Sequence, residues 1–164
     1  MTSEPHLEER PAQPYAAIGA RVTMAQIGPV CPPLVDEVFA WLAARGIAPA
    51  GPPFFRYLVI DMSHELELEL GVPIAEPLQV ADGRVHGGVF PAGWYVVAVH
   101  TGPYEELMAA TGQLLAWGEA NGVTWDATPD QREWAARIES YLTDPAEEPD
   151  PSRWRTELAF RVRR

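Results

Sequence analysis

The residue with the clearest chemical potential is Glu157, which lies in the C-terminal segment RTELAFRVRR (155–164). Apolar and polar residues alternate there, which predicts a strand with one buried face and Glu157 on the other. A carboxylate surrounded by aromatic rings can pair with a cation. Burial would also raise its pKa, which suits a general acid or base. Alternation alone favours a simpler interpretation, a solvated acid loosely paired with Arg155 or Arg161.

Two tyrosines could complete a cation site around such a carboxylate. Tyr57 and Tyr141 occupy similar segments, FRYLVID and ESYLTDP, one in each half of the chain. Each ring that faces a bound cation contributes about 0.5–2 kcal/mol. The alternative is that both rings cover a sheet face and keep their hydroxyls in water. Phe55 and Glu139 share the faces of these tyrosines and are the next candidates.

Further aromatic residues near predicted loops could close over a ligand, because insertions beside a groove often act as lids. Trp125 lies in an insertion of the second half of the chain, and Phe54 follows Pro52-Pro53 in the first half. Trp94 begins a predicted strand and is also a candidate.

Several common types of site are missing from the sequence. The four histidines have no metal-ligand spacing, and the single cysteine, Cys31, has no basic neighbour. We therefore expect no metal site, no cofactor and no thiol nucleophile. No G-x-S-x-G, P-loop or G-x-G-x-x-G motif occurs, which disfavours serine hydrolase, NTPase and dinucleotide chemistry.

The charge balance limits the classes of molecule that the protein is expected to bind. The chain has 12 arginines, no lysine and 23 acidic residues, which gives a net charge of −11. Such a chain is poorly suited to binding nucleic acid or an anionic membrane surface. A single cysteine fits a reducing compartment, the N-terminus lacks an apolar signal core, and unbroken apolar runs such as Trp94–Val99 are far too short to span a bilayer. These features predict a soluble, cytoplasmic protein.

The chain contains an internal repeat, and this repeat must position the candidate residues. Four short matches occur in the same order in both halves, at offsets that grow along the chain, as expected for a duplication with loop insertions. The matches are Gly28-Pro29 with Gly102-Pro103, Trp41 and Gly46 with Trp117 and Gly122, Tyr57-Leu58 with Tyr141-Leu142, and Glu67-Leu68 with Glu157-Leu158.

Each half is predicted to form a strand, a helix and two further strands. The first helix is expected after Pro32-Pro33 and the second is expected to end at Asn121-Gly122. Leu66, Leu68 and Leu70 are expected to pack under a helix, with the tyrosines and glutamates on the helix-free face. The predicted organisation is a polar N-terminal segment (1–14) followed by one domain (15–164). That domain comprises a first half (15–75), a linker (76–88) and a second half (89–164).

The second half resembles the GyrI-like effector-binding domains, which also occur fused to AraC-type and MerR-type regulators. The resemblance rests on GPY followed by a helix with LLAW and NGV, then SYLTDP, then RTELAF, and it covers about residues 94–162. It implies an α+β fold in which duplicated β-α-β-β modules form an antiparallel sheet with pseudo-twofold symmetry. Helices would lie on one side, and a ligand groove lined by helix-free sheet faces would lie between the halves.

The resemblance also implies roles for particular residues. Glu157 takes the position of the family's counter-charge for a cationic ligand, and Tyr141 the position of a groove tyrosine. The first half departs from the family, because its sister strand carries three glutamates. The polar segment 1–14 is too short for a helix-turn-helix, so direct DNA binding is not expected.

The leading hypothesis is a monomer or homodimer that binds bulky, lipophilic, often cationic aromatic molecules. A hydrolase that opens cyclopropane rings of strained electrophilic natural products is the first alternative, with Glu157 and Tyr141 as catalytic residues. A protein that inhibits a DNA topoisomerase by binding it is the second. The same scaffold serves all three, so the sequence favours a binding protein but leaves enzymatic activity open.

Overall fold

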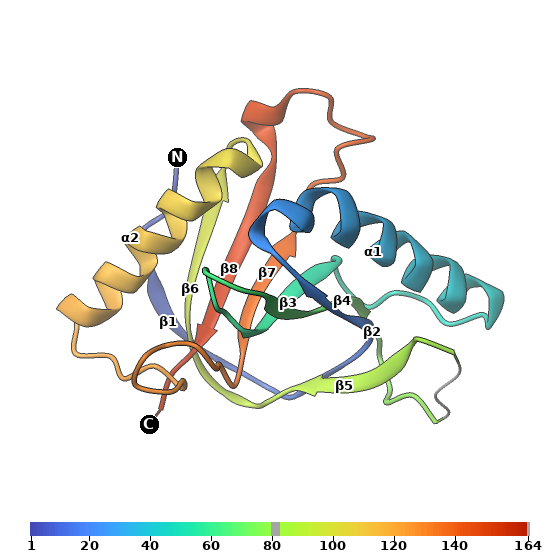
Figure 1. Ribbon diagram of the computed structural model, residues 1–164, viewed down its shortest axis with the longest axis horizontal. Helices are drawn as coiled ribbons and strands as arrows, with labels where there is room; N and C mark the ends of the chain where they lie inside the picture. Colours follow the sequence, from blue (N-terminus) through green and yellow to red (C-terminus); the bar gives the residue numbers. More distant parts are fainter. Residues whose placement is uncertain (80–82, 164) are drawn as a thin grey trace.

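The alternating segments form strands and the longer apolar stripes form helices in a computed structural model, which describes residues 1–79 and 83–163. The eight strands of the described residues belong to one sheet with antiparallel neighbours. Both α-helices lie on one side of it (Figure 1). The strands are β1 His6–Arg10, β2 Gln13–Val22, β3 Phe54–Val59, β4 Leu66–Pro73, β5 His86–Phe90, β6 Gly93–Thr101, β7 Arg137–Tyr141 and β8 Arg155–Arg161. The α-helices are α1 Ile27–Ala44 and α2 Leu107–Ala120, and 3₁₀ turns occupy Met24–Gln26, Tyr104–Glu106 and Pro151–Arg153.

The strand order shows the duplication directly. Across the sheet the order is β1-β6-β8-β7-β3-β4-β2-β5, so β2-α1-β3-β4 and β6-α2-β7-β8 are equivalent modules that meet at the β3–β7 pair. Phe55 pairs with Glu139 across this junction. These two residues are also equivalent in the repeat, so the pseudo-twofold axis passes between them. The predicted α+β class, duplication and placement of the helices are confirmed.

The strand registers correct two of the predicted repeat matches. Phe55 pairs with Leu70 as its equivalent, Glu139, pairs with Leu158, so Leu70 of β4 corresponds to Leu158 of β8. The counterpart of Glu157 is therefore Glu69, not Glu67. The Gly-Pro match is also wrong, because Gly28-Pro29 lies inside α1 whereas Gly102-Pro103 precedes a 3₁₀ turn.

The observed C-terminal ends of both helices match the predicted positions, whereas the observed start of α1 does not. Gly46 and Gly122 follow α1 and α2 with φ values of 67° and 70°, the left-handed conformation expected after a helix. However, α1 begins at Ile27, upstream of the predicted start. Pro32 and Pro33 leave early carbonyl groups of α1 without partners. The first turns there are exposed, so water can satisfy those groups.

Two edge strands lie where the sequence predicts none. β1 falls in the predicted polar N-terminal segment, and β5 begins within the predicted linker, of which residues 80–82 lie outside the described residues. Each edge strand crosses to the other module, because β1 pairs with β6 and β5 with β2. The similar segments PAQPY (11–15) and PAGWY (91–95) follow these strands and could have revealed them.

The helices pack mainly on the outer strands of their own modules. α1 packs against β2 and β4, and α2 packs against β6. The two central strands, β3 and β7, lie between the helices (Figure 1). The helix side of the sheet is consequently apolar core beneath each helix and more open along its middle.

The segment Met24–Ala44 is long enough and apolar enough to cross a membrane by length and composition alone, with a mean hydropathy of 1.2. The unbroken apolar runs of the sequence miss it, because Asp36 and Glu37 interrupt the segment. In the fold its buried residues pack on the sheet, so the helix forms part of the core.

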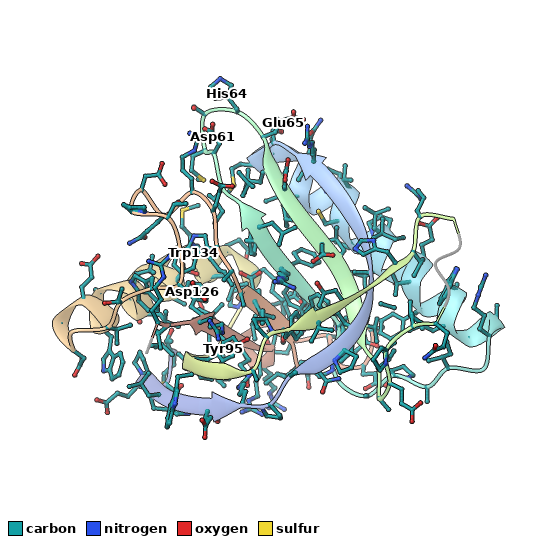
Figure 2. The ribbon with its side chains drawn as sticks, turned by 90° about the horizontal axis from the view of Figure 1, so that it is seen from below. Asp61, His64, Glu65, Tyr95, Asp126 and Trp134 are labelled. Atoms are coloured by element: carbon teal, nitrogen blue, oxygen red, sulfur yellow. The ribbon has the colours of Figure 1, made fainter. Side chains whose placement is uncertain are left out.

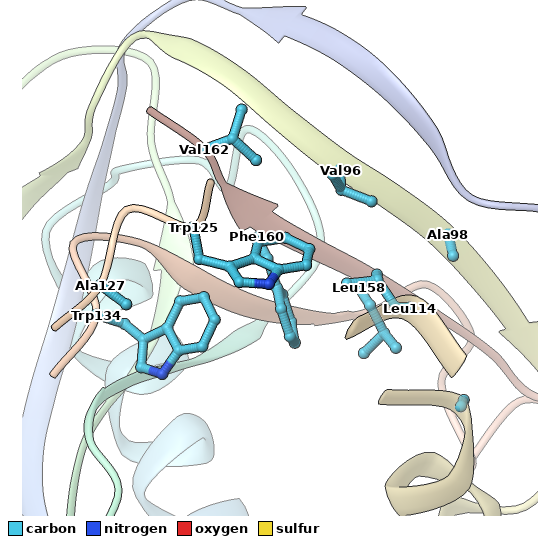
Figure 3. Close-up of a cluster of buried hydrophobic side chains, with 10 residues drawn as sticks. Val96, Ala98, Leu114, Trp125, Ala127, Trp134, Leu158, Phe160 and Val162 are labelled. Atoms are coloured by element: carbon cyan, nitrogen blue, oxygen red, sulfur yellow. The ribbon is translucent and has the colours of Figure 1, made fainter. Parts of the chain in front are cut away.

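Trp125 packs directly on α2, so substitution of a helix glycine beneath it provides a test of this core. A Cβ atom at Gly118 would overlap the Trp125 ring. Trp125 itself is buried beside Trp134 and Phe160 (Figure 3). We expect Gly118→Ala to lower the free energy of unfolding by about 1–3 kcal/mol in a urea titration, because the core must move to admit the methyl group.

Gly112→Ala is the matched control in the same helix, since a Cβ atom there would meet nothing within 4 Å. It should raise the free energy of unfolding by about 0.5–1 kcal/mol, as alanine favours helix. Equal stabilisation by both substitutions would contradict the packing described for Trp125.

Candidate ligand-binding site

The structure divides the predicted site residues between the two faces of the sheet. Ser140 pairs with Glu157 and Tyr141 with Thr156, so Glu157 and Tyr141 point to opposite sides. Phe55, Tyr57, Glu139 and Tyr141 lie together on the helix side. Phe54 and Glu157 lie on the helix-free side, whereas Trp125 is buried in the core under α2 and Trp94 packs against that core.

The sequence predicted the leucines under the helices and the tyrosines on the helix-free face. This placement is wrong, because the leucine and tyrosine side chains lie on the same face of the sheet. Phe55 pairs with Leu70, and Leu70 packs in the core cluster that contains Cys31 and Val35 of α1. The aromatic and acidic residues of β3 and β7 therefore do not lie on the helix-free face. Phe55 is buried, whereas Tyr57, Glu139 and Tyr141 remain partly exposed because the helices pack mainly on the outer strands.

A row of aromatic rings crosses the middle of the helix side. The Tyr141 ring contacts Phe55 at 4.8 Å and Tyr104 at 5.6 Å between ring centroids, and Tyr104 contacts Trp154 at 4.7 Å. Tyr104 and Trp154 are additions to the predicted set. The GPY motif contains the first, but no pattern in the sequence indicates the second. We call the set Phe55, Tyr57, Glu139, Tyr141, Tyr104 and Trp154 the central face.

Glu139 is the one acid of the central face. The Tyr141 hydroxyl donates a hydrogen bond to its Oε1 atom at 2.5 Å, and Tyr57 is placed to hydrogen-bond the same carboxyl. Burial raises the pKa of Glu139 above its ordinary value, against the opposing effects of the two tyrosines and of the Arg137 charge. Among the described residues, Glu139 forms no ion pair within 4.0 Å.

Glu157 occupies a different environment on the helix-free face. It lines a pocket of about 310 Å³ together with Arg10, Tyr95, Phe90 and Ser140. Arg10 Nη1 donates a hydrogen bond to Glu157 Oε1 at 2.9 Å, so this carboxylate already has a cationic partner. Figure 2 views the molecule from this helix-free side, and Tyr95 is labelled there.

The equivalent acid of the first module is neutralised in the same way. The Tyr15 hydroxyl and His86 Nε2 each lie 2.5 Å from a Glu69 carboxyl oxygen, and Arg56 lies 3.8 Å from it. The two equivalent glutamates, Glu157 and Glu69, thus both have protein cations beside them. Glu139 is left as the carboxyl whose close partners are phenols.

Metal binding finds no support in the part of the chain that the structure describes. Within residues 1–79 and 83–163, no group of three or more His, Cys, Asp or Glu side chains could hold an ion. The chemistry available on the central face is that of one carboxyl, tyrosine hydroxyls and aromatic rings, with the Arg137 guanidinium beside them.

Comparison with known proteins identifies a family. A family model described as the GyrI-like small molecule binding domain matches residues 3–163. Among curated proteins, no sequence matches this chain.

Similar solved structures share the fold at low sequence identity. The EcmrR C-terminal domain is 22% identical with a TM-score of 0.78, and the match covers 98% of each chain. EcmrR in its DNA complex is 23% identical with a TM-score of 0.79, and this chain spans 57% of that longer one. A hydrolase from Listeria innocua is 16% identical, with a TM-score of 0.63 over 98% of this chain and 92% of the other. SAV2435 bound to tetraphenylphosphonium is 10% identical, with the same TM-score over 98% and 94%.

The raised pKa of Glu139 makes stability depend on pH in a defined direction. The folded protein holds this proton more tightly than the unfolded chain, so Glu139 favours folding at low pH and loses that contribution as the pH rises through its folded pKa. Glu139→Gln removes the titration. We therefore expect the free energy of unfolding of the variant, relative to wild type, to increase as the pH is raised from 4 to 8.

Urea titrations of both proteins at each pH measure this difference, and the other carboxyl groups cancel in the comparison. A wild-type–variant difference that does not change with pH would show that Glu139 is not desolvated.

Proposed function

The chain belongs to the GyrI-like family of small-molecule-binding domains, and we propose that it binds bulky lipophilic aromatic molecules, cations among them, on its central face. Glu139 provides the carboxylate, and Tyr57, Tyr141, Phe55 and Tyr104 provide ring surfaces. The observation that carries this proposal is the position of Glu139, a desolvated carboxyl within a row of rings and without an ion-pair partner among the described residues.

Ligand charge and ligand rings would act together at this position. A cation placed near Glu139 would favour its ionised form and recover the electrostatic energy that burial costs the free protein. Rings around the same cation add about 0.5–2 kcal/mol per contact. Contact between the ligand and the partly exposed rings of the protein also buries apolar surface. This burial contributes about 25 cal/mol of binding free energy for each Å² removed from water.

Glu157 is not the counter-charge in this proposal. A ligand cation at Glu157 would have to displace Arg10, which already bonds the carboxylate at 2.9 Å. Its pocket also lies on the opposite face from Tyr57 and Tyr141. We assign the Arg10–Glu157 pair instead to holding β1 against the sheet.

The comparisons support a lipophilic aromatic ligand without identifying it. SAV2435, which has the same fold, is described as bound to tetraphenylphosphonium, a lipophilic aromatic cation. EcmrR carries this fold as the C-terminal domain of a longer chain. Tetraphenylphosphonium is therefore a suitable probe for this chain.

The test compares two glutamate variants with one cation. We expect Glu139→Gln to weaken tetraphenylphosphonium binding about 10- to 100-fold in calorimetric titrations, equivalent to about 1.4–2.8 kcal/mol, because the counter-charge is lost. Glu157→Gln is the matched control and should change the dissociation constant less than threefold. Triphenylphosphine oxide, which is neutral, should bind wild type and Glu139→Gln alike.

The reverse ranking, with Glu157→Gln the more damaging, would move the ligand to the helix-free pocket. Equal losses for the cation and the neutral compound would remove the counter-charge role from Glu139.

Hydrolysis is a second candidate function, favoured by the same raised pKa. A carboxyl whose pKa is raised by burial holds its proton to higher pH and can act as a general acid, and the Tyr141 hydroxyl lies 2.5 Å from it. The fold is shared with a Listeria innocua protein described as a hydrolase. If this activity is present, the ring of a cyclopropane-containing electrophile should be opened, as monitored by absorbance, and Glu139→Gln should abolish the turnover. Turnover unchanged in that variant would exclude the mechanism.

A further inference from the structure

We infer that Arg137 binds an anionic or strongly accepting group of the ligand, so that the central face selects zwitterionic aromatic molecules over simple cations. This inference rests on the proposed function and specifies its ligand class. It assigns to Arg137 a role that neither the sequence pattern nor the comparisons suggest.

Arg137 lies on the same face as the acid of the site. It and Glu139 are next-but-one neighbours on β7, so both side chains project to the helix side, about 6.6 Å apart along the strand. A single bound molecule can therefore reach both groups. Its cationic part would meet Glu139 and its acceptor would meet Arg137.

The guanidinium of Arg137 is surrounded by aromatic rings. Its central carbon lies 4.6 Å from the centroid of Phe160, 5.0 Å from that of Trp134 and 5.9 Å from that of Tyr57. Stacking of this kind orients the guanidinium plane and leaves its N–H groups directed away from the ring faces. Burial lowers the pKa of Arg137 to about 10, so the group remains charged at neutral pH.

The donors of Arg137 are not used by the protein. Four of the described arginines are half-buried, and Arg10, Arg56 and Arg161 each have a carboxylate within 4.0 Å. Arg137 is the exception. Within the described part of the chain its guanidinium has no hydrogen bond or ion pair, and none of its nitrogens is a buried orphan, so its N–H groups reach solvent.

These features distinguish a binding group from a structural one. A structural arginine at this depth is expected to bond a carboxylate or a carbonyl, because unmet donors of a buried charge are costly. Water can meet those donors in the free protein, and a ligand carboxylate can replace that water with two parallel hydrogen bonds. A plain monocation gains nothing from Arg137 and is repelled by it.

A pair of xanthene dyes tests the inference. Rhodamine 110 carries a free carboxylate beside its cationic ring system, and rhodamine 123 is its methyl ester. Fluorescence anisotropy titrations at pH 7 should show wild type binding rhodamine 110 at least threefold more tightly than rhodamine 123. Arg137→Gln should weaken rhodamine 110 binding tenfold or more and leave rhodamine 123 binding unchanged or improved.

Two further variants complete the design. Arg137→Lys keeps the charge but loses the fork geometry, and it should retain part of the preference for the free acid. Arg155→Gln, at an exposed arginine that starts β8, is the control and should alter neither dissociation constant. The wild-type ratio of the two dyes tests the inference even if a variant fails to fold.

The outcomes separate the two proposals. If wild type binds neither dye nor tetraphenylphosphonium, both the proposed function and the inference about Arg137 are overturned. If wild type binds both dyes with equal affinity, or if Arg137→Gln weakens both to the same extent, only the role of Arg137 is overturned.

Discussion

The pairing of β3 with β7 is the contact on which the rest of the structure depends. It joins two equivalent modules into one sheet, with Phe55 and Glu139 facing each other at the pseudo-twofold axis. Each module has one helix, and each helix packs on the outer strands of its own module. The middle of the sheet therefore lacks a helix above it, which allows aromatic and charged side chains to remain there while the flanks become apolar core.

At this junction the two modules differ in which residues carry charge. Glu139 stands where the first module has Phe55, and Arg137 stands where it has Pro53. The Glu139 carboxyl and the neighbouring Arg137 guanidinium consequently both come from β7, whereas β3 contributes rings. A symmetric site would accept a ligand in two opposite orientations. The two ends of the proposed site differ, so a ligand with different groups at its ends would have one preferred direction.

Periodicity predicted the modules, most of the strands and the helix ends, because these depend on local patterns such as the glycines after α1 and α2. It did not predict β1 or β5, whose sequences HLEER and HGGVF lack alternation, since edge strands need little apolar surface. The assignment of faces failed for a different reason. Alternation shows that Glu157 and Leu158 point apart, but whether Tyr141 joins one or the other depends on the register between β7 and β8. The register between two strands cannot be predicted from the sequence of either strand alone.

The crossing of the edge strands bears on the origin of the fold. β1 precedes the first module yet completes the sheet of the second, and β5 does the converse. A lone ancestral module with such a leading strand would have had no partner for it except a second copy of itself. Two copies exchanging these arms would form a closed, symmetric dimer. The present chain has the arrangement that such a dimer would take if its two subunits were joined end to end, and in a joined chain each module can change without altering the other.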